Sequence, residues 1–417
     1  MDVKDKVVLV RVDFNSPLDP KTKKVLDDAR IRAHGSSTIR ELAEKGAKVV
    51  VLAHQGRKGE PDFIPLKEHA ELLAGILSRQ VGYVDDVYGS TAREAIKALR
   101  SGEILVLGNV RTFPLETSEG KPADLANTEL VRSLAPLADL FVLDAFAAAH
   151  RAHASIIGFT AVLPSAAGRV MERELRALNR VLGAPQKPSL FILGGAKADD
   201  SLEISKYVLG HKIADHVLTG GVVAQVFLVA KGYDLGEQNM AFLEKKGLMA
   251  LVPGIRRLVQ KYPRRILTPY DVAVVVGGKR QEMPVSRLPT AHLIGDIGEK
   301  TIEKYGRLIQ GAKSIVFSGP MGVYEERETA LGTKRILEEI AKSRAFSVAG
   351  GGHTISALDE FRLSPRITYV STAGGALTEF LMGKKLPGVA ALEAAAKRKK
   401  VRSSAARHRV RSRSKAR

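Results

Sequence analysis

Arginine and histidine side chains recur in the first half of the sequence, at or near the ends of predicted strands: Arg30, His54, Arg57, Arg111, His150 and Arg151. An arginine presents a planar fork of N–H donors that matches phosphate or carboxylate, and it stays charged at any working pH. One exposed arginine would be an ordinary surface charge, but several on separate loops can hold a small dianion. We therefore predict an anion-binding site here. Arg11 lies within a predicted strand and is interpreted as structural.

Two further polar residues, Asp13 and Asn15, follow the first predicted strand. Both residue types commonly form turns. A carboxylate and an amide can also accept from and donate to one hydroxyl group. The sequence leaves both interpretations open.

Glycines take the strand-end positions in the second half: Gly194 and Gly195, Gly220 and Gly221, Gly319 and Gly322, Gly350 to Gly352, and Gly374 and Gly375. Backbone N–H groups can reach phosphate oxygens where no Cβ intervenes, and a helix N-terminus adds the positive end of its dipole. Five such loops predict a nucleotide site. Neither the G-x-x-x-x-G-K-[ST] motif nor G-x-G-x-x-G is present, which argues against those two classes.

Two charged residues lie beside these loops. Lys197 directly follows Gly194-Gly195-Ala196 and suits a phosphoryl group in transit, because a merely solvated lysine at a helix start would oppose the helix dipole. Glu325 can accept from ribose hydroxyls or cap the next helix, and the sequence does not decide between these roles.

Other kinds of chemistry find no support in the sequence. The chain has no cysteine, which excludes disulfides, Cys-ligated zinc and a thiol nucleophile. None of the ten histidines forms an H-E-x-x-H motif, and there is no G-x-S-x-G elbow. These absences argue against hydrolysis by metal-bound water and against serine-based acyl transfer.

Short β-branched runs alternate with helix-period segments, which is typical of βαβ units and parallel sheets. Strands are predicted at 7–12, 49–53, 104–107, 140–143, 190–193, 216–219, 315–317, 346–348 and 367–370. Helices are predicted at 66–79, 91–99, 222–230 and 336–341. In doubly wound sheets ligands bind outside the carboxyl ends of the strands, where both sets of candidate residues fall.

We therefore predict an α/β fold with two Rossmann-like, doubly wound parallel-sheet domains joined by a hinge helix. The expected organisation is an N-terminal domain over 1–166, an interdomain helix over 167–182, a C-terminal domain over 183–386 and a return segment over 387–396. Domains of this size are common.

The remaining residues, 397–417, carry eleven of the 65 Lys and Arg and no acid, against a net charge of +20 for the whole chain. So dense a run of like charge predicts a disordered tail. The tail suits sequence-independent contact with a polyanion, or it is a solvated appendage without consequence. The mixed charges at the N-terminus argue against a signal peptide, and no apolar stretch approaches the ~18–20 residues of a membrane span, so we expect a cytoplasmic protein.

Seven segments together resemble the phosphoglycerate kinase family. The segments are Arg11-Val-Asp-Phe-Asn-Ser-Pro17, His54-Gln-Gly-Arg57, Asp144-Ala-Phe-Ala-Ala-Ala-His-Arg-Ala-His153, Leu193-Gly-Gly-Ala-Lys197, Gly319-Pro-Met-Gly-Val-Tyr-Glu325, Gly350-Gly-Gly-His-Thr354 and Ser371-Thr-Ala-Gly-Gly-Ala376. The match runs in order from Arg11 to about Leu386-Pro-Gly-Val-Ala-Ala391, nearly the whole chain apart from the basic tail. The resemblance implies a two-domain kinase that closes about a hinge. It would transfer a phosphoryl group reversibly between 1,3-bisphosphoglycerate with ADP and 3-phosphoglycerate with ATP, in glycolysis and gluconeogenesis, as a monomer using Mg²⁺ with ATP or ADP.

The resemblance also implies roles for individual residues. His54, Arg57, Arg111 and Arg151 would hold the phosphate of 3-phosphoglycerate, while Asp13, Asn15 and Arg30 would position its hydroxyl and carboxyl end. Arg30 and Lys197 would flank the transferring phosphoryl group, and amides at Gly350 to Gly352 and near Gly374 would complete the cage. The nucleotide would contact a larger set, with Glu325 on the ribose: Gly194, Gly195, Lys197, Ser201, Gly220, Gly319, Pro320, Gly322, Glu325, Gly350, Gly351, Gly352, His353 and Thr354.

Four positions depart from the commonest family pattern: His353, Ser201, Ser318 and Gly108. His353 replaces an aspartate that helps to hold Mg²⁺, and Mg²⁺ prefers oxygen ligands. We therefore expect the nucleotide phosphates to hold most of the ion, near His353. The Gly-Gly-Gly-His-Thr segment and Ser201 look like the archaeal branch of the family, so we interpret them as lineage variation. We expect an active enzyme because five basic residues of the family pattern are all present: Arg30, Arg57, Arg111, Arg151 and Lys197.

Two other functions remain open from sequence alone. The chain could be a nucleic-acid-binding or scaffold protein that works through its tail, with the kinase body vestigial. It could also be another two-domain kinase for small anionic acids. The arginine cluster distinguishes the last case, because it predicts a strong demand for a phosphate on the substrate.

Overall fold

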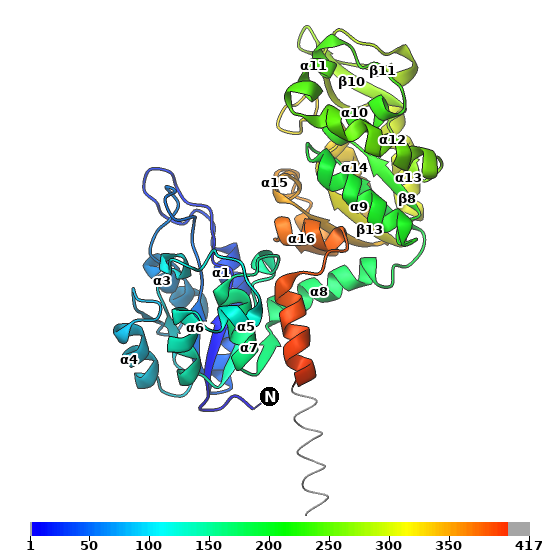
Figure 1. Ribbon diagram of the computed structural model, residues 1–417. Helices are drawn as coiled ribbons and strands as arrows, with labels where there is room; N and C mark the ends of the chain where they lie inside the picture. Colours follow the sequence, from blue (N-terminus) through cyan, green and yellow to red (C-terminus); the bar gives the residue numbers. More distant parts are fainter. Residues whose placement is uncertain (1, 399–417) are drawn as a thin grey trace, which may run out of the picture. The chain divides into compact units, whose positions relative to one another are not determined.

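The computed structural model describes residues 2–398, and these form two compact units that each contain a six-stranded sheet (Figure 1). The first unit comprises residues 2–174 and 385–398, and the second comprises residues 175–384. Both large sheets are parallel throughout. The predicted α/β class with two parallel sheets is therefore confirmed.

The first sheet has the strand order β3-β4-β2-β1-β5-β6. Its strands are β1 (Val7–Arg11), β2 (Lys48–Leu52), β3 (Gly82–Tyr83), β4 (Ile104–Val106), β5 (Leu140–Leu143) and β6 (Ser165–Ala167). Val8 of the central strand β1 pairs with Val49 on one side and Leu140 on the other. The central strands are buried almost along their whole length, as expected where helices cover both faces of a parallel sheet.

Helices of the first unit connect and cover these strands. They are α1 (Ala29–His34), α2 (Arg40–Glu44), α3 (Lys67–Leu77), α4 (Ser90–Ala98), α5 (Pro122–Leu125), α6 (Glu129–Leu134), α7 (Phe159–Val162) and a helix over 387–398. In α3 the buried positions His69, Ala70, Leu73 and Leu77 recur every three or four residues, which makes one face of the helix part of the core.

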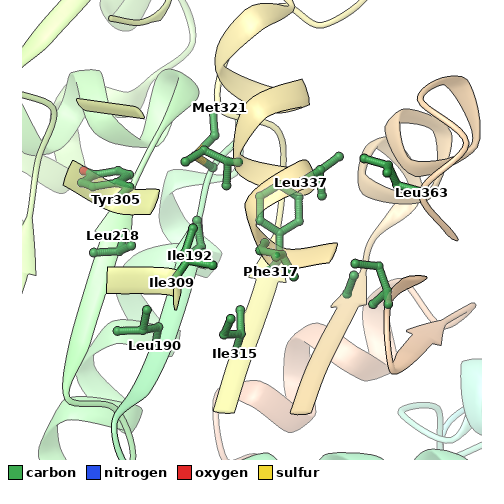
Figure 2. Packing of buried hydrophobic residues seen from close by; sticks show 14 of the residues in the cluster. Leu190, Ile192, Leu218, Tyr305, Ile309, Ile315, Phe317, Met321, Leu337 and Leu363 are labelled. Carbon is green, nitrogen blue, oxygen red and sulfur yellow. The ribbon is translucent and has the colours of Figure 1, made fainter. Parts of the chain in front are cut away.

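The second sheet has the strand order β15-β14-β13-β7-β8-β9. Its strands are β7 (Ser189–Leu193), β8 (His216–Thr219), β9 (Ile266–Leu267), β13 (Ser314–Ser318), β14 (Phe346–Gly350) and β15 (Tyr369–Ser371). Figure 2 shows how Ile192 and Phe317 from the sheet face Tyr305 and Leu337 from the helices of one layer. The Tyr305 hydroxyl is buried and donates to the carbonyl of Leu267 at 2.9 Å, so its burial leaves no polar group unpaired.

Helices of the second unit alternate with its strands. They are α9 (Ala198–Gly210), α10 (Gly221–Ala230), α11 (Glu237–Lys245), α12 (Val252–Lys261), α13 (Glu299–Gly311), α14 (Leu331–Lys342), α15 (Gly352–Glu360) and α16 (Gly375–Leu381). Helix α10 is apolar nearly all round and is correspondingly buried from Val223 to Ala230.

A small antiparallel sheet in the second unit was missed by the sequence analysis. It has the order β11-β10-β12 and consists of β10 (Asp271–Val276), β11 (Lys279–Pro284) and β12 (Ile294–Ile297). Gly277 and Gly278 connect its first two strands, and both have positive φ, as a two-residue hairpin turn requires. This Gly-Gly pair was the available signal in the sequence.

Helix α8 (Arg169–Leu182) carries the chain from the first unit into the second, since the division falls between Glu174 and Leu175. Residues 397 and 398 continue the helix over 387–398, and Arg398 donates to the carbonyl of Thr160. The rest of the predicted tail, 399–417, lies outside the described residues. Among the residues described, no helix combines the length and apolar character needed to cross a membrane.

Candidate functional site

A cavity of about 510 Å³ lies in the first unit and brings together five of the predicted residues, Asn15, His54, Arg57, Arg111 and Arg151. They follow β1, β2, β4 and β5, which are neighbours in the sheet. Parallel strands end at the same edge, so these loops converge although they are up to 136 positions apart in the chain. Its other lining residues were not predicted: Leu18, Asp19, Pro20, Lys23, Gly56, Glu60, Pro61 and Asp62.

Two buried amides fix the loops that carry these side chains. The Gln55 side chain accepts from the Ser16 N–H at 2.9 Å and donates to the Ser16 carbonyl at 3.1 Å, which ties the loop after β2 to the loop after β1. The Asn109 amide donates to the Gln55 carbonyl at 2.7 Å and accepts from the Arg111 N–H at 3.1 Å. Sequence reasoning assigned neither side chain a role, because each bonds to the main chain of a loop that is distant in the sequence.

Asp13 and Arg30 do not line this cavity, but they form an ion pair with each other. The Asp13 carboxylate also accepts from the Asn15 N–H at 3.1 Å, and the Asn15 side chain accepts from the Gly56 N–H at 2.8 Å. Both interpretations of the Asp13–Asn15 segment are therefore compatible with the geometry. The two side chains shape the turn after β1. Asn15 also lines the cavity, where a ligand can contact it.

The protonation state of His54 follows from its neighbour Arg11. The Arg11 Nη2 lies 3.2 Å from His54 Nδ1. Because a guanidinium only donates, Nδ1 must accept and the imidazole proton is on Nε2. Burial, followed by the charges of Arg11 and Arg111, holds the pKa of His54 well below its usual value. His54 is thus a neutral N–H donor.

A buried carboxylate, Glu116, lies among the cationic groups. It accepts from the Ser155 N–H at 3.1 Å, and Ser155 Oγ in turn accepts from Arg11 Nε at 2.8 Å. Burial raises the pKa of Glu116 and lowers that of Arg11, while the opposite charge of each partner acts against both shifts. The sequence analysis missed Glu116. Arg11, which it interpreted as structural, is buried at the end of β1.

Cationic side chains outnumber carboxylates in the lining of the cavity, with Lys23, Arg57, Arg111 and Arg151 against Asp19, Glu60 and Asp62. Burial and then the charges of Arg151 and Arg11 lower the pKa of Arg111 to about 10. The same surroundings lower the pKa of His153 to about 4, chiefly through burial and then through Arg151. A bound anion would relieve the repulsion among these groups, so the site is suited to phosphate or carboxylate.

A second cavity, of about 190 Å³, lies in the second unit. Five residues of the predicted nucleotide set line it: Gly195, Pro320, Gly322, Glu325 and His353. Gly221, which belongs to one of the predicted glycine loops, also lines it. The remaining lining is largely apolar and was not predicted: Ala196, Val222, Ala224, Gln225, Leu228, Pro269, Val272, Ile294, Gly295, Asp296, Ile297, Met321 and Val323. The other predicted residues are not in the lining: Gly194, Lys197, Ser201, Gly220, Gly319, Gly350, Gly351, Gly352, Thr354 and Gly374.

Two glycines of the loop after β7 allow it to contact the loop after β13. The Gly194 N–H donates to the Ser318 carbonyl at 2.8 Å, and the Gly195 N–H donates to the Pro320 carbonyl at 2.7 Å. A Cβ on Gly194 would lie 2.2 Å from the Pro320 oxygen. Gly194 is therefore required for the loops after β7 and β13 to meet. Its amide and that of Gly195 are already engaged, so they are not the donors for a phosphate.

The amides best placed for phosphate are at helix starts. Gly351 precedes α15 and Gly374 precedes α16, and the first-turn N–H groups of any helix have no partner within that helix. Lys197 occupies the same position before α9, with its side chain 80% exposed and Nζ 3.9 Å from the Asp200 carboxylate. Ser201 instead donates to the Lys197 carbonyl at 3.0 Å and supports that turn.

Asp296 is a buried carboxylate in the cavity wall that sequence reasoning missed. It accepts from Arg280 at 2.9 Å and from the Gly332 N–H at 2.7 Å. Burial raises its pKa to about 6, against the effect of these bonds. A Cβ on Gly322 would lie 2.4 Å from its Oδ1, so Gly322 allows the loop after β13 to pack on this carboxylate.

Glu325 and His353 lie together at this cavity, with His353 Nδ1 3.7 Å from Glu325 Oε1. Both side chains are exposed. Within residues 2–398, no group of three or more histidine, cysteine, aspartate or glutamate side chains is arranged to hold a metal ion. The donor set of the described chain therefore does not fit a Mg²⁺ ion coordinated mainly by protein oxygens.

Comparison with known proteins gives a consistent result. A family model described as phosphoglycerate kinase matches residues 1–384. A phosphoglycerate kinase of Methanothermobacter thermautotrophicus is 47% identical over 393 residues, which cover 94% of this chain and 95% of the relative. A phosphoglycerate kinase of Sulfurisphaera tokodaii is 44% identical, with 94% of each chain covered.

A solved structure agrees with the sequence relatives. The crystal structure of the phosphoglycerate kinase from Pyrococcus horikoshii matches with a TM-score of 0.86 and 41% identity, and covers 95% of this chain and 98% of that one. Relatives at 44% to 47% identity are mainly archaeal, as the Gly-Gly-Gly-His-Thr segment indicated.

Proposed function

Because the chain belongs to the phosphoglycerate kinase family, we propose that the cationic cavity of its first unit binds the triose substrate. The family reaction transfers a phosphoryl group reversibly between 1,3-bisphosphoglycerate with ADP and 3-phosphoglycerate with ATP, in glycolysis and gluconeogenesis. The convergence of Arg57, Arg111 and Arg151 on one cavity is the observation that carries this proposal. The three guanidinium groups and the neutral His54 would hold the phosphate that is not transferred.

The turn after β1 would orient the rest of the triose. Asp13 and Asn15 would hold its hydroxyl group, because a carboxylate accepts and an amide donates. Arg30, which is paired with Asp13, would reach the carboxyl end that receives the phosphoryl group.

The second unit would bind the nucleotide. The largely apolar cavity suits a flat base, and the exposed Glu325 carboxylate at its edge would accept from the ribose hydroxyls. The phosphates would extend toward the helix starts at Gly351 and Gly374, where backbone N–H groups and the helix dipoles favour negative charge.

Transfer needs positioning and charge neutralisation more than covalent chemistry. Lys197 and Arg30 would flank the phosphoryl group in transit, and the amides at Gly350 to Gly352 would stabilise its developing charge. Since the two substrates would bind different units, the reaction depends on the hinge closure predicted from the sequence. Closure would also exclude water, which would otherwise hydrolyse the acyl phosphate.

The family uses a nucleotide that normally carries Mg²⁺. We propose that the nucleotide phosphates hold most of this ion, near His353, because the described residues do not form a carboxylate site for it. Binding of Mg²⁺ in the absence of nucleotide should then be weak. Tight binding of Mg²⁺ to the free protein by calorimetry would contradict this part of the proposal.

A coupled assay tests the substrate. The chain should phosphorylate 3-phosphoglycerate with ATP and Mg²⁺, and it should act poorly on unphosphorylated glycerate because the arginine cluster would have no phosphate to bind. Similar turnover of both acids would indicate instead a general kinase for small acids. No turnover by the folded protein would end the proposal.

The tail requires a separate test. The sequence also predicts a cytoplasmic monomer whose residues 397–417 contact polyanions without sequence preference, and these remain predictions. Because Arg398 belongs to the helix over 387–398, the chain should be shortened directly after it. The shortened protein should keep its turnover and lose retention on heparin at low salt. Loss of turnover would favour a protein that works through its tail.

A further inference from the structure

His34 and Asp144 form a buried pair that the proposed chemistry does not use. His34 is the last residue of α1, and Asp144 directly follows β5. Their side chains are 4% and 0% exposed, and His34 Nδ1 lies 2.9 Å from Asp144 Oδ2. Burial of a histidine and a carboxylate away from water costs free energy unless specific hydrogen bonds compensate for the lost hydration.

The second nitrogen of His34 fixes the direction of the hydrogen bonds. The backbone N–H of Asp13 donates to His34 Nε2 at 3.3 Å. Nε2 must therefore be unprotonated, and the ring proton lies on Nδ1, where it is donated to Asp144. This tautomer is assigned by the hydrogen-bond network. The ring thus joins Asp144 to the residue proposed to hold the triose hydroxyl.

The second oxygen of Asp144 extends the network to helix α8. Oδ1 accepts from the N–H groups of Val170 and Met171, at 2.8 and 3.0 Å. These amides belong to the first turn of α8, where a carboxylate is favoured by the helix dipole. A Cβ on Gly168 would lie 2.3 Å from Asp144 Cγ, so the chain before α8 is fitted closely around this carboxylate.

We propose that His34 and Asp144 are positioning residues that couple Asp13 to the first turn of α8. The proposal rests on the proposed binding of the triose at Asp13. One continuous series of hydrogen bonds, from Asp13 through His34 and Asp144 to Val170 and Met171, lies within the first unit. Because α8 is the helix through which the chain passes into the second unit, a triose that fixes Asp13 also steadies the start of that helix.

His69 provides a matched control for a purely structural role of His34. Both are fully or nearly fully buried histidines of the first unit, and both rings lie beside Phe14, with centroids at 6.3 Å for His34 and 6.4 Å for His69. His69 Nε2, however, is 3.1 Å from Gln55 Oε1 and has no part in the bonds to Asp144. Gln55 holds the loops of the cationic cavity, so the control must keep a donor for it. His69→Gln keeps that donor and disturbs the packing beside Phe14, but it leaves the hydrogen bonds between Asp13 and Asp144 intact.

The decisive variant is Asp144→Asn. Its oxygen can still accept from the α8 amides, but its NH₂ group faces His34 and requires Nδ1 to accept. The ring proton must then move to Nε2, where it opposes the Asp13 N–H. The ¹⁵N signals of His34 should report this change of tautomer. We expect the KM for 3-phosphoglycerate to rise about tenfold, with the KM for ATP changed less than about twofold.

Amide exchange measured by NMR completes the test, with 3-phosphoglycerate alone as the probe. In the unmodified chain, saturating 3-phosphoglycerate should slow exchange at Val170 and Met171. Asp144→Asn and His34→Asn should lose this protection, and His69→Gln should keep it. His34→Asn retains a donor for Asp144 and removes the acceptor for Asp13, so it tests the same link should Asp144→Asn fold poorly.

Three results would overturn the proposal. Unchanged exchange at Val170 and Met171 while 3-phosphoglycerate binds the unmodified chain would show that Asp13 and α8 are not coupled. An equal rise in KM for His69→Gln would show that the effect comes from packing alone. No binding of 3-phosphoglycerate by the unmodified chain would instead refute the proposed function, and with it the coupling that rests on it.

Discussion

The two cavities differ in which part of the chain builds them. In the first unit, charged side chains from four strand-end loops face one cavity, and buried amides such as Gln55 and Asn109 hold the loops in place. In the second unit, the loops approach each other through glycines, and the cavity is lined mainly by apolar groups and backbone. One site depends on the positions of charges, and the other depends on how closely main chains can meet.

This difference predicts different sensitivities. Charged side chains can be removed one at a time without disturbing the sheet beneath them, so their loss should weaken binding of one substrate. A side chain added to a packed loop displaces its neighbours, so glycine substitutions should affect binding and stability together.

Lys197 should have the largest effect, because it is proposed to act only on the phosphoryl group in transit. Lys197→Met should lower kcat by about 10²–10³, with little change in the KM for 3-phosphoglycerate. Steady-state kinetics measures this loss. Lys206→Met, which removes an exposed lysine from the same helix, is the control and should leave kcat unchanged. A pure rise in the KM for ATP would assign Lys197 to ground-state nucleotide binding.

Substitution of Arg111 should show that binding of 3-phosphoglycerate at the first site depends on individual charged side chains. Arg111→Met removes charge-assisted hydrogen bonds and should raise the KM for 3-phosphoglycerate by roughly 10- to 100-fold. The KM for ATP should stay constant, because the nucleotide is proposed to bind the other unit. Arg93→Met removes an exposed arginine of α4 and should be neutral. An equal change in both KM values would break the proposed separation of the sites.

Substitution of Gly194 should show that ATP binding at the second site depends on the close approach of two main-chain loops. In Gly194→Ala the new Cβ meets the Pro320 oxygen at 2.2 Å, and overpacking of this kind costs about 1–3 kcal/mol. We expect roughly tenfold weaker ATP binding and a lower melting temperature, with binding of 3-phosphoglycerate retained. Gly311→Ala adds a Cβ in open space and should change neither. Unimpaired ATP binding in Gly194→Ala would show that the loops tolerate separation.

Acid should affect the two units in opposite directions. Burial lowers the pKa of His69 to about 4, below its ordinary value of about 6.5, so stability is lost as the pH falls through this range. Asp296 has a pKa raised to about 6, so the folded second unit favours its protonated form, and this contribution is lost as the pH rises. Acidification should therefore destabilise the first unit through His69, whereas protonation of Asp296 should stabilise the second unit.

His69→Gln measures the first part of this contrast. It should reduce the change in unfolding free energy between about pH 7 and about pH 5.5 by about 1 kcal/mol. Urea titrations followed through amide signals of each unit would show it. Asp296→Asn is the counterpart, and it should make the second unit less dependent on pH between about 4 and about 6. Identical pH profiles for variant and unmodified chains would mean that these two groups do not govern the response.

Much of the fold could be predicted from the sequence. The alternation of β-branched runs and amphipathic helices gave the strands of the two parallel sheets, apart from β3, β6 and β9, to within two residues, such as β5 at Leu140–Leu143. The short strands β3 and β9 have only two residues each, too few for a periodic signal. The hairpin of β10 and β11 was missed although Gly277-Gly278 marked its turn, because β11 is largely exposed and carries charged residues instead of an apolar run.

The candidate site, like the fold, was predicted only in part from the sequence. Sequence alone determined which residues are arginine, histidine or glycine at strand ends, and parallel topology then requires those ends to share an edge of the sheet. It could not reveal that Arg11 fixes the tautomer of His54, that Glu116 lies among the arginines, or that His34 joins Asp13 to Asp144. These contacts link residues as far as 110 positions apart, and they exist only because folding removes the groups from water together and leaves each with the other as partner.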